Sequence, residues 1–202
     1  MRTLVAAVTL LIAGIAVFSW ASDGFRVATA EGVRRLAISQ HPVAVPGVTM
    51  EDMKGHVLHL SKTRDRVLLV EFIYTTCPTI CQDLGTGFAE IRESARKRGI
   101  EDRLRLFSVS FDLENDTSER LQTYADHHGA DGTVWKVVRP TSQQNLDALL
   151  ETFGVKILPD PLFGFQHNVA IHVVDGSGKL VRIVDAEPAI ALEALAEEIN
   201  RL

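Results

Sequence analysis

The stretch Val67–Leu84, with the sequence VLLVEFIYTTCPTICQDL, decides the fold. Its first part, Val67–Tyr74, is a short apolar run rich in branched and aromatic residues, which predicts a buried strand. Pro78 suits the first turn of a helix, where its missing N–H group would have no partner. The sequence therefore predicts a strand, a turn and a helix, with the two cysteines of the protein, Cys77 and Cys81, at the junction.

Cys77 and Cys81 are spaced for chemistry rather than for structural cross-linking. If the helix begins at Pro78, the cysteines are one turn apart, so both sulfur atoms can face the same side. The amide groups at a helix N-terminus favour a thiolate, so we expect both thiols to ionise more readily than a free cysteine. A disulfide between them would close a very small loop and would contribute little stability. The pair therefore predicts a redox site or a site for a soft metal ion.

The composition is that of a globular protein of 202 residues, with 46% apolar and 23% charged residues. This length accommodates one domain of ordinary size and an appendage. The net charge of −5, without a long basic run, argues against nucleic acid as a partner. Two cysteines are too few for a small scaffold held by disulfides, so the fold must depend on its hydrophobic core.

The N-terminal segment carries an uncharged run, Leu4–Trp20, that follows Arg2. Its length suits a single membrane-spanning helix or a long signal-peptide core, so residues 1–22 are predicted to be an anchor or a signal segment. The residues around Ala21 make a poor signal-peptidase site, which favours a retained anchor. With Arg2 before the run and Asp23 after it, the domain is expected on the periplasmic, extracytoplasmic side of the inner membrane.

The remainder divides into a linker, residues 23–46, with about one helical turn around Val33–Ile38, and a folded domain, residues 47–202. The domain begins with a hairpin of two short strands, Val48–Met50 and His56–Leu60. Further strands are predicted at Val67–Tyr74, Leu104–Phe111, Val134–Val138, Val169–Val174 and Lys179–Asp185. Helices are predicted from Pro78 to Arg98, over Ser118–His128, from a Thr141 cap to Phe153, and from Pro188 onward.

This alternation predicts an α/β fold with a mixed, mainly parallel sheet and flanking helices. The turn Asp175–Gly178 makes the last two strands a C-terminal β-hairpin, which a final helix follows. A cysteine pair at the end of the first core strand, on the opening turn of the first core helix, indicates a thioredoxin-like fold.

Two sulfur ligands rarely hold a metal ion selectively, so a third ligand is expected. The candidates are the seven histidines, His41, His56, His59, His127, His128, His167 and His172. His127 and His128 end a predicted helix, where they complement the helix dipole, and His172 reads as a half-buried strand residue. His167 closes a long loop, Val155–Asn168, that would lie against the cysteines in a thioredoxin-like fold. Its position alone leaves its role open.

Three segments resemble the Sco/SenC family. Tyr74–Cys81, YTTCPTIC, is similar to the family signature YTxCPxxC. Ser108–Thr117, which begins SVSFD and ends in Asp-Thr, is similar to SVDPxxDT, and His167–Asp175 is similar to DHSxxxYLxD. The resemblance covers about Val48–Leu202.

The chain departs from the family pattern at Gln82, Phe111, Leu113 and Gln166. The family usually has Asp where this chain has Gln166, a change that bears on the orientation of His167 but removes no metal ligand. Asp112 and Asp116 are interpreted as acids on a solvated turn and are not counted as ligands.

The resemblance implies a membrane-tethered copper-binding protein that helps assemble the dinuclear copper (CuA) centre of cytochrome c oxidase. Cys77, Cys81 and His167 would bind copper, as Cu(I) or Cu(II), with Cu(I) held chiefly by the sulfur atoms. The implied partners are the copper-accepting subunit of a terminal oxidase, a periplasmic copper donor and a thiol reductant.

The main alternative is a membrane-tethered thiol–disulfide oxidoreductase that uses Cys77 and Cys81 as a redox pair and keeps target cysteines reduced. The two roles are compatible because copper loading requires reduced sulfur, so enzymatic activity is left open. A peroxiredoxin is excluded, since Tyr74 stands where that active site needs a threonine. A structural zinc site would need four protein ligands.

Overall fold

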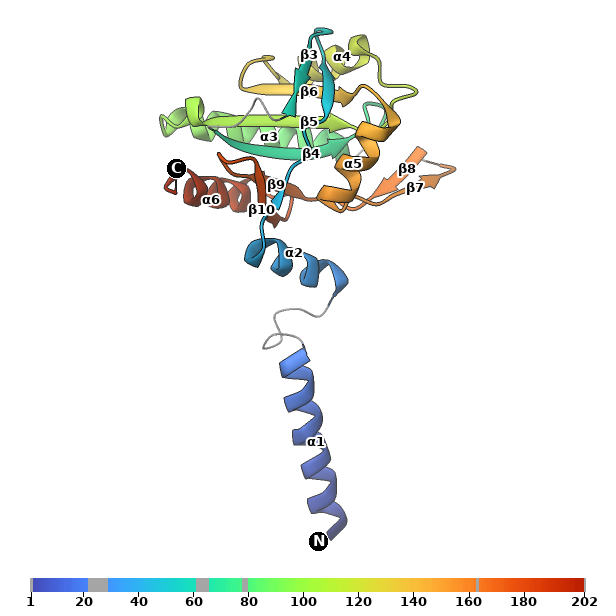
Figure 1. The fold of residues 1–202 in the computed structure, drawn as a ribbon, viewed down its shortest axis with the longest axis vertical. Helices are drawn as coiled ribbons and strands as arrows, with labels where there is room; N and C mark the ends of the chain where they lie inside the picture. The colour runs from blue at the N-terminus through green and yellow to red at the C-terminus, as the bar shows by residue number, and fades with distance from the viewer. Residues whose placement is uncertain (1, 22–28, 61–65, 78–79, 163, 202) are drawn as a thin grey trace.

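The computed structural model describes residues 2–21, 29–60, 66–77, 80–162 and 164–201 (Figure 1). The strands are β1 (Val43–Ala44), β2 (Thr49–Asp52), β3 (Val57–His59), β4 (Val67–Ile73), β5 (Leu104–Ser110), β6 (Trp135–Pro140), β7 (Ile157–Asp160), β8 (Gly164–His167), β9 (Ile171–Val174) and β10 (Lys179–Val184). The α-helices are α1 (Arg2–Ala21), α2 (Ala30–Gln40), α3 (Ile80–Lys97), α4 (Ser118–His128), α5 (Gln143–Phe153) and α6 (Pro188–Ile199), and a short 3-10 helix covers Glu101–Arg103.

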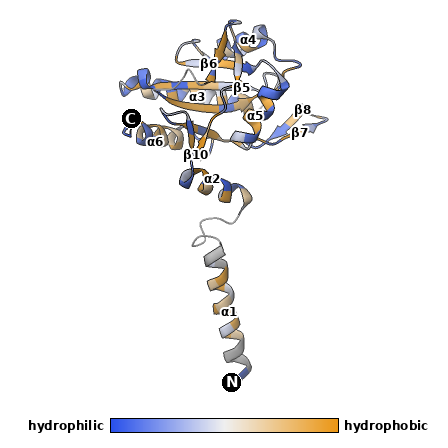
Figure 2. Cartoon of the chain, in the orientation of Figure 1, coloured by the Kyte–Doolittle hydropathy of each residue, from blue (hydrophilic) through white to orange (hydrophobic). Residues whose placement is uncertain are grey.

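Eight strands form one mixed sheet in the order β1-β10-β9-β4-β5-β6-β2-β3. The predicted central strand is confirmed, because β4 lies inside this sheet and all of its seven residues are buried. Figure 2 shows the central strands mainly in hydrophobic colours, as expected for strands that are covered on both faces.

Helices cover both faces of the sheet. Phe72 of β4 packs on Phe153 of α5, with ring centroids 5.4 Å apart. On the other face, Phe88 of α3 packs on Trp135, with ring centroids 5.9 Å apart. Trp135 is linked through a side-chain hydrogen bond to Ser108, which in turn donates to Glu71, the neighbour of Phe72. Because successive strand residues point to opposite faces, α3 and α5 lie on opposite sides of β4.

The mixed sheet is confirmed, but the prediction that it is mainly parallel is wrong. Among the described strands, only the pairings β4–β5 and β5–β6 are parallel, and the remaining pairings are antiparallel. Parallel neighbours require a crossover connection, which α3 and α4 supply. The chain after α5 first forms the β7–β8 hairpin and then enters β9 in the direction opposite to β4.

The β7–β8 hairpin lies within the predicted loop Val155–Asn168. Its pairing runs from Ile157 opposite His167 to Asp160 opposite Gly164. These two strands were not predicted from the sequence, because Pro159 and Pro161 weaken the strand pattern. The hairpin forms a separate two-stranded sheet and so makes no ladder with the main sheet.

Helix limits followed local capping signals closely. The limits of α4 are confirmed: Thr117 accepts a hydrogen bond from the Arg120 N–H group, and Gly129 adopts a left-handed conformation with φ of 80°. The cap of α5 is Ser142 and not Thr141, because the Thr141 hydroxyl donates to the Thr49 carbonyl of β2.

The helical turn expected around Val33–Ile38 is part of a longer helix, α2, which contacts β10. Ile38 is buried, and the Arg34 guanidinium donates to the Phe153 carbonyl at 2.7 Å. β1 then pairs with β10 at the edge of the main sheet. Figure 1 shows α1 apart from the rest of the fold. Among the residues that the structure describes, no helix combines the length and the apolar character that a membrane crossing demands.

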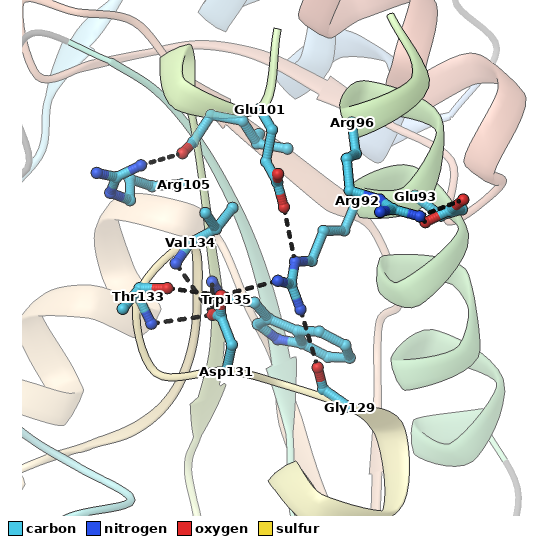
Figure 3. Close-up of polar contacts among 11 residues, drawn as sticks. Arg92, Glu93, Arg96, Glu101, Arg105, Gly129, Asp131, Thr133, Val134 and Trp135 are labelled. Atoms are coloured by element: carbon cyan, nitrogen blue, oxygen red, sulfur yellow. Dashed lines mark hydrogen bonds and ion pairs between the residues drawn. The ribbon is translucent and has the colours of Figure 1, made fainter. Parts of the chain in front are cut away.

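Arg92 fastens α3 to the loops that enter the central strands (Figure 3). Its guanidinium pairs with Glu101 at 3.0 Å and with Asp131 at 2.8 Å, and it donates to the Gly129 carbonyl at 3.1 Å. The indole of Trp135 lies beside this group, as Figure 3 shows. The helix that begins beside the cysteines is therefore anchored to the fold farther along its length.

Glu71 is a carboxyl group in the middle of the core. It is fully buried on β4, where its Oε1 accepts a hydrogen bond of 2.5 Å from the Ser108 hydroxyl. Its Oε2 has no hydrogen-bond partner within the described part of the chain. Burial raises the pKa of Glu71 to about 8, so the folded protein holds this proton at pH values where an exposed glutamate is ionised.

We expect stability to fall as the pH rises from about 7 to 8, because in this interval the unfolded chain has already lost the Glu71 proton, the folded protein still holds it, and the buried histidines are neutral in both states. Glu71→Gln should flatten this dependence. The measurement is the free energy of unfolding in urea at several pH values, with Glu90→Gln on the surface of α3 as the control. Parallel curves for the wild type and Glu71→Gln would contradict the assignment.

Candidate metal centre

The two cysteines meet at the turn between β4 and α3. The Cys77 N–H group donates to the Tyr74 carbonyl at 3.2 Å, which closes the turn. Cys81 lies in the first turn of α3, and its N–H group donates to the Cys77 sulfur at 3.4 Å. Both are free thiols, with exposed fractions of 3% and 0%. The structure thus brings the two predicted sulfur positions together.

Burial governs the ionisation of Cys81. Its removal from water, together with the neighbouring Cys77 thiol, raises the pKa of the Cys81 thiol far above its usual value. The expectation that both thiols ionise readily is therefore wrong for Cys81. The cost of placing a thiolate in the core outweighs the favourable field at the start of α3.

Asp116 holds the cysteine turn in place. Its carboxylate accepts hydrogen bonds from the Thr75 N–H group at 2.9 Å, from the Thr75 hydroxyl at 2.5 Å and from the Ser110 hydroxyl at 2.5 Å. Asp116 is completely buried, and Asp112 is 5% exposed, so their interpretation as solvated acids is wrong. The chain after β5 folds back under the turn that follows β4. The signal in the sequence was the place of Asp116 shortly after a strand parallel to β4.

His167 is the last residue of β8, and one of its two ring nitrogens, Nε2, is buried. Its Nδ1 lies 3.2 Å from the Asn168 carbonyl, so Nδ1 carries the proton and Nε2 carries the lone pair. Nε2 is buried and lacks a hydrogen-bond partner among the described residues. Burial also lowers the pKa of His167, which keeps the ring neutral. A neutral imidazole with a free lone pair is the form that ligates metals.

Cys77 and His167 line the same cavity, of about 320 Å³, between the cysteine turn and the β7–β8 hairpin. Tyr74, Ile80 and Phe165 supply the apolar part of its wall. Cys81 is fully buried and is not among the lining residues. Within the described ranges, no three side chains of His, Cys, Asp or Glu already meet as a metal-binding group.

His172 does not line this cavity, and Gln166 lines it but directs its side-chain amide to the other strand of the hairpin. His172 is in the core, where its ring nitrogens lie 3.3 Å and 3.1 Å from the carbonyls of Val70 and Phe153, and burial lowers its pKa to about 4. Gln166 donates to Asp160 across the hairpin at 2.5 Å. The group that orients the His167 ring is thus the Asn168 carbonyl and not residue 166.

Tyr74 was missed as a site residue, although it stands in the cysteine segment. It is 2% exposed, and its hydroxyl donates to the Phe165 carbonyl at 3.1 Å. Burial and the adjacent Cys77 thiol raise the pKa of Tyr74 to about 12, so the hydroxyl remains protonated. Tyr74 thereby connects the cysteine turn to the hairpin that carries His167.

The fold and the site together define a thioredoxin-like protein with a buried Cys-x₃-Cys thiol pair and a histidine on a neighbouring hairpin. The family model described as SCO1/SenC matches residues 45–202, and the chain belongs to this family.

Two relatives share about a quarter of their residues with this chain. The SCO1 protein homolog of Bacillus subtilis is 24% identical over 136 residues, which cover 66% of this chain and 69% of that protein. The SCO2-like protein of Rickettsia conorii is 26% identical over 156 residues, which cover 73% of each chain.

Solved structures confirm the predicted thioredoxin-like α/β fold. A SCO1/SenC family lipoprotein from Bacillus anthracis has a TM-score of 0.71 and 16% identity, covering 81% of this chain and 98% of that chain. Copper-bound ScoI of Bradyrhizobium japonicum has a TM-score of 0.65 and 19% identity, covering 79% and 99%. BsSco, described as a member of the Sco family of cytochrome c oxidase assembly proteins with a disulfide switch, has a TM-score of 0.67 and 21% identity, covering 79% and 93%.

We expect Asp116→Asn to destabilise the protein by about 1–3 kcal/mol, because a buried charged acceptor of three hydrogen bonds is lost. The loosened turn should also make Cys77 react faster with a thiol reagent. Denaturant unfolding and the rate of thiol labelling measure the two effects. Glu114→Gln, at an exposed acid of the same loop, is the control and should change neither quantity.

Proposed function

We propose that this protein binds one copper ion through Cys77, Cys81 and His167 and helps assemble the dinuclear copper centre of cytochrome c oxidase. One observation carries the proposal. The Nε2 atom of His167 is buried and has no hydrogen-bond partner among the described residues, and His167 lines the same cavity as Cys77. The Cys77 sulfur in turn accepts a hydrogen bond from the Cys81 N–H group.

The donor set suits copper. Thiolate sulfur is a soft ligand that favours Cu(I), and a neutral imidazole is an accepted third ligand for copper. A site of two or three ligands leaves room for an incoming ligand, so the ion can pass to a partner by ligand exchange. Copper must displace the proton of Cys81, because burial holds this thiol in its neutral form.

Two relatives support the assignment. ScoI of Bradyrhizobium japonicum, which shares this fold, has been solved with copper bound. BsSco belongs to a family described as cytochrome c oxidase assembly proteins. The copper-accepting subunit of a terminal oxidase is accordingly the partner that we propose, with a periplasmic copper donor and a thiol reductant acting before it.

A thiol–disulfide oxidoreductase is the second candidate. The two free thiols belong to residues four positions apart, the Cys81 N–H group donates to the Cys77 sulfur, and BsSco is described as having a disulfide switch. The raised pKa of Cys81 weighs against rapid exchange through that thiol, since the thiolate is the reactive form. Copper binding is therefore the primary proposal.

An anaerobic Cu(I) titration of the full-length chain against a competing chelator tests the copper site. We expect one tight copper ion per chain. Cys77→Ser or Cys81→Ser should weaken binding by more than about a hundredfold, and His167→Ala by about tenfold to a hundredfold. His56→Ala, at an exposed histidine of the β2–β3 hairpin, should leave binding unchanged.

If the wild type binds no copper tightly, while a disulfide between Cys77 and Cys81 exchanges readily with thiols, copper delivery is excluded and the protein is a thiol–disulfide oxidoreductase.

The location is a separate part of the proposal. We propose that residues 1–22 tether the domain to the inner membrane on its periplasmic side, on the basis of the uncharged run Leu4–Trp20 behind Arg2. The full-length chain should then remain with the membrane fraction after an alkaline wash, and a chain that begins at Asp23 should be released. Equal release of both chains would contradict a retained anchor.

A further inference from the structure

A second cavity borders the cysteine turn. It measures about 420 Å³ and shares no lining residue with the cavity of Cys77 and His167. Its walls come from the turn, from α3 and from α4, and include Thr75, Thr76, Gln82, Arg120, Tyr124 and His127. The cysteine turn therefore borders two cavities with different linings.

Two residues that line this cavity form hydrogen bonds with the backbone carbonyls of Cys77 and Cys81. The Tyr124 hydroxyl donates to the Cys81 carbonyl at 2.6 Å. The Gln82 side chain donates to the Cys77 carbonyl at 3.3 Å, and its oxygen lies 3.0 Å from Nε2 of His128. A group that binds here is held at a fixed place relative to the two thiols.

The remaining polar side chains of this cavity can donate hydrogen bonds, and the guanidinium of Arg120 can only donate. The Thr75 hydroxyl is committed to Asp116. Thr76, Arg120 and His127 have no hydrogen bond or ion pair from their side chains in the part of the chain that the structure describes, and all three are exposed. No Asp or Glu belongs to the lining, so the cationic guanidinium is not neutralised within the cavity.

Another arginine-lined cavity of the same protein provides a contrast. The cavity of about 290 Å³ beside α3 also contains two arginines, Arg92 and Arg96. Arg92 is paired with Asp131 at 2.8 Å, as Figure 3 shows, and Arg96 is paired with Glu93 at 2.8 Å. Arg120, in contrast, is available to a carboxylate that comes from outside.

We infer that the second cavity binds an acidic side chain of a cysteine-bearing segment of a partner protein and so directs the cysteine of that segment to Cys77. One guanidinium with a hydroxyl nearby suits a single carboxylate, whereas a phosphate would call for several converging donors. Thr76 is the residue next to Cys77, so a segment bound here lies against the turn that carries the thiol, while the thiol itself lines the neighbouring cavity. The inference rests on the proposed function only for the nature of the partner.

Mixed-disulfide formation with metal-free, reduced, full-length protein tests this inference. Two peptides carry the same cysteine as a disulfide with thionitrobenzoate and differ only in a flanking Glu or Gln. The Cys77 thiolate attacks the peptide sulfur, a Cys77–peptide disulfide forms, and thionitrobenzoate leaves with the electron pair of the broken bond. The release of the coloured anion gives the rate. The Glu-to-Gln rate ratio cancels any change in the reactivity of Cys77 itself.

We expect the Glu peptide to react up to about fivefold faster at low salt, the range of an exposed ion pair. Arg120→Gln should reduce the ratio to about one. Arg98→Gln, the same charge change at an exposed residue just after α3, should preserve it.

Four results would overturn the inference: no preference in the wild type, a ratio unaffected by Arg120→Gln, an equal loss with Arg98→Gln, or no reaction with either peptide. A comparison of iodoacetate with iodoacetamide forms a further arm. An Arg120-dependent preference for iodoacetate without one for the Glu peptide would assign the cavity to small anions and overturn the inference. Because no copper is present, the result is independent of the copper titration.

Discussion

The hydrogen bond from the Tyr74 hydroxyl to the Phe165 carbonyl joins segments that lie 91 residues apart in the chain. Tyr74 leads into the cysteine turn, and Phe165 stands two residues before His167. The rings of Tyr74, Phe165 and Phe111 pack on one another with centroids 5.4–5.6 Å apart. Such rigid aromatic contacts fix the distance between the turn and the hairpin. The cavity that Cys77 shares with His167 exists because these two segments are held together.

Removal from water is the main electrostatic influence at the centre of the molecule. It raises the pKa of Cys81 and of Glu71, and it lowers the pKa of His167 and of His172, so all four groups favour their neutral forms. A buried site of this kind resists an unpaired charge. A monovalent cation that replaces one thiol proton, or a divalent cation that replaces two, leaves the total charge of the site unchanged, which makes metal binding compatible with a dry interior.

The strand–turn–helix at the cysteines could be predicted from the sequence because its determinants are local. The apolar run of β4, the residues that cap α4 and the hairpin turn before β10 each act on their own neighbourhood. The segment Tyr74–Cys81 also carried the resemblance to the family that the comparisons then showed. The order of elements followed, since each apolar or amphipathic run reports its own period.

By itself, therefore, the sequence determined the thioredoxin-like class, the cysteine pair, and the elements of the domain other than β1, β7 and β8. Only the tertiary structure decided that Asp116 supports the turn, that β7 and β8 form a hairpin, and that Cys81 is harder to ionise than a free cysteine. Each of these depends on segments that meet in space from distant parts of the chain. Burial and the pKa are properties of the packed interior, and a local pattern does not report what will cover it.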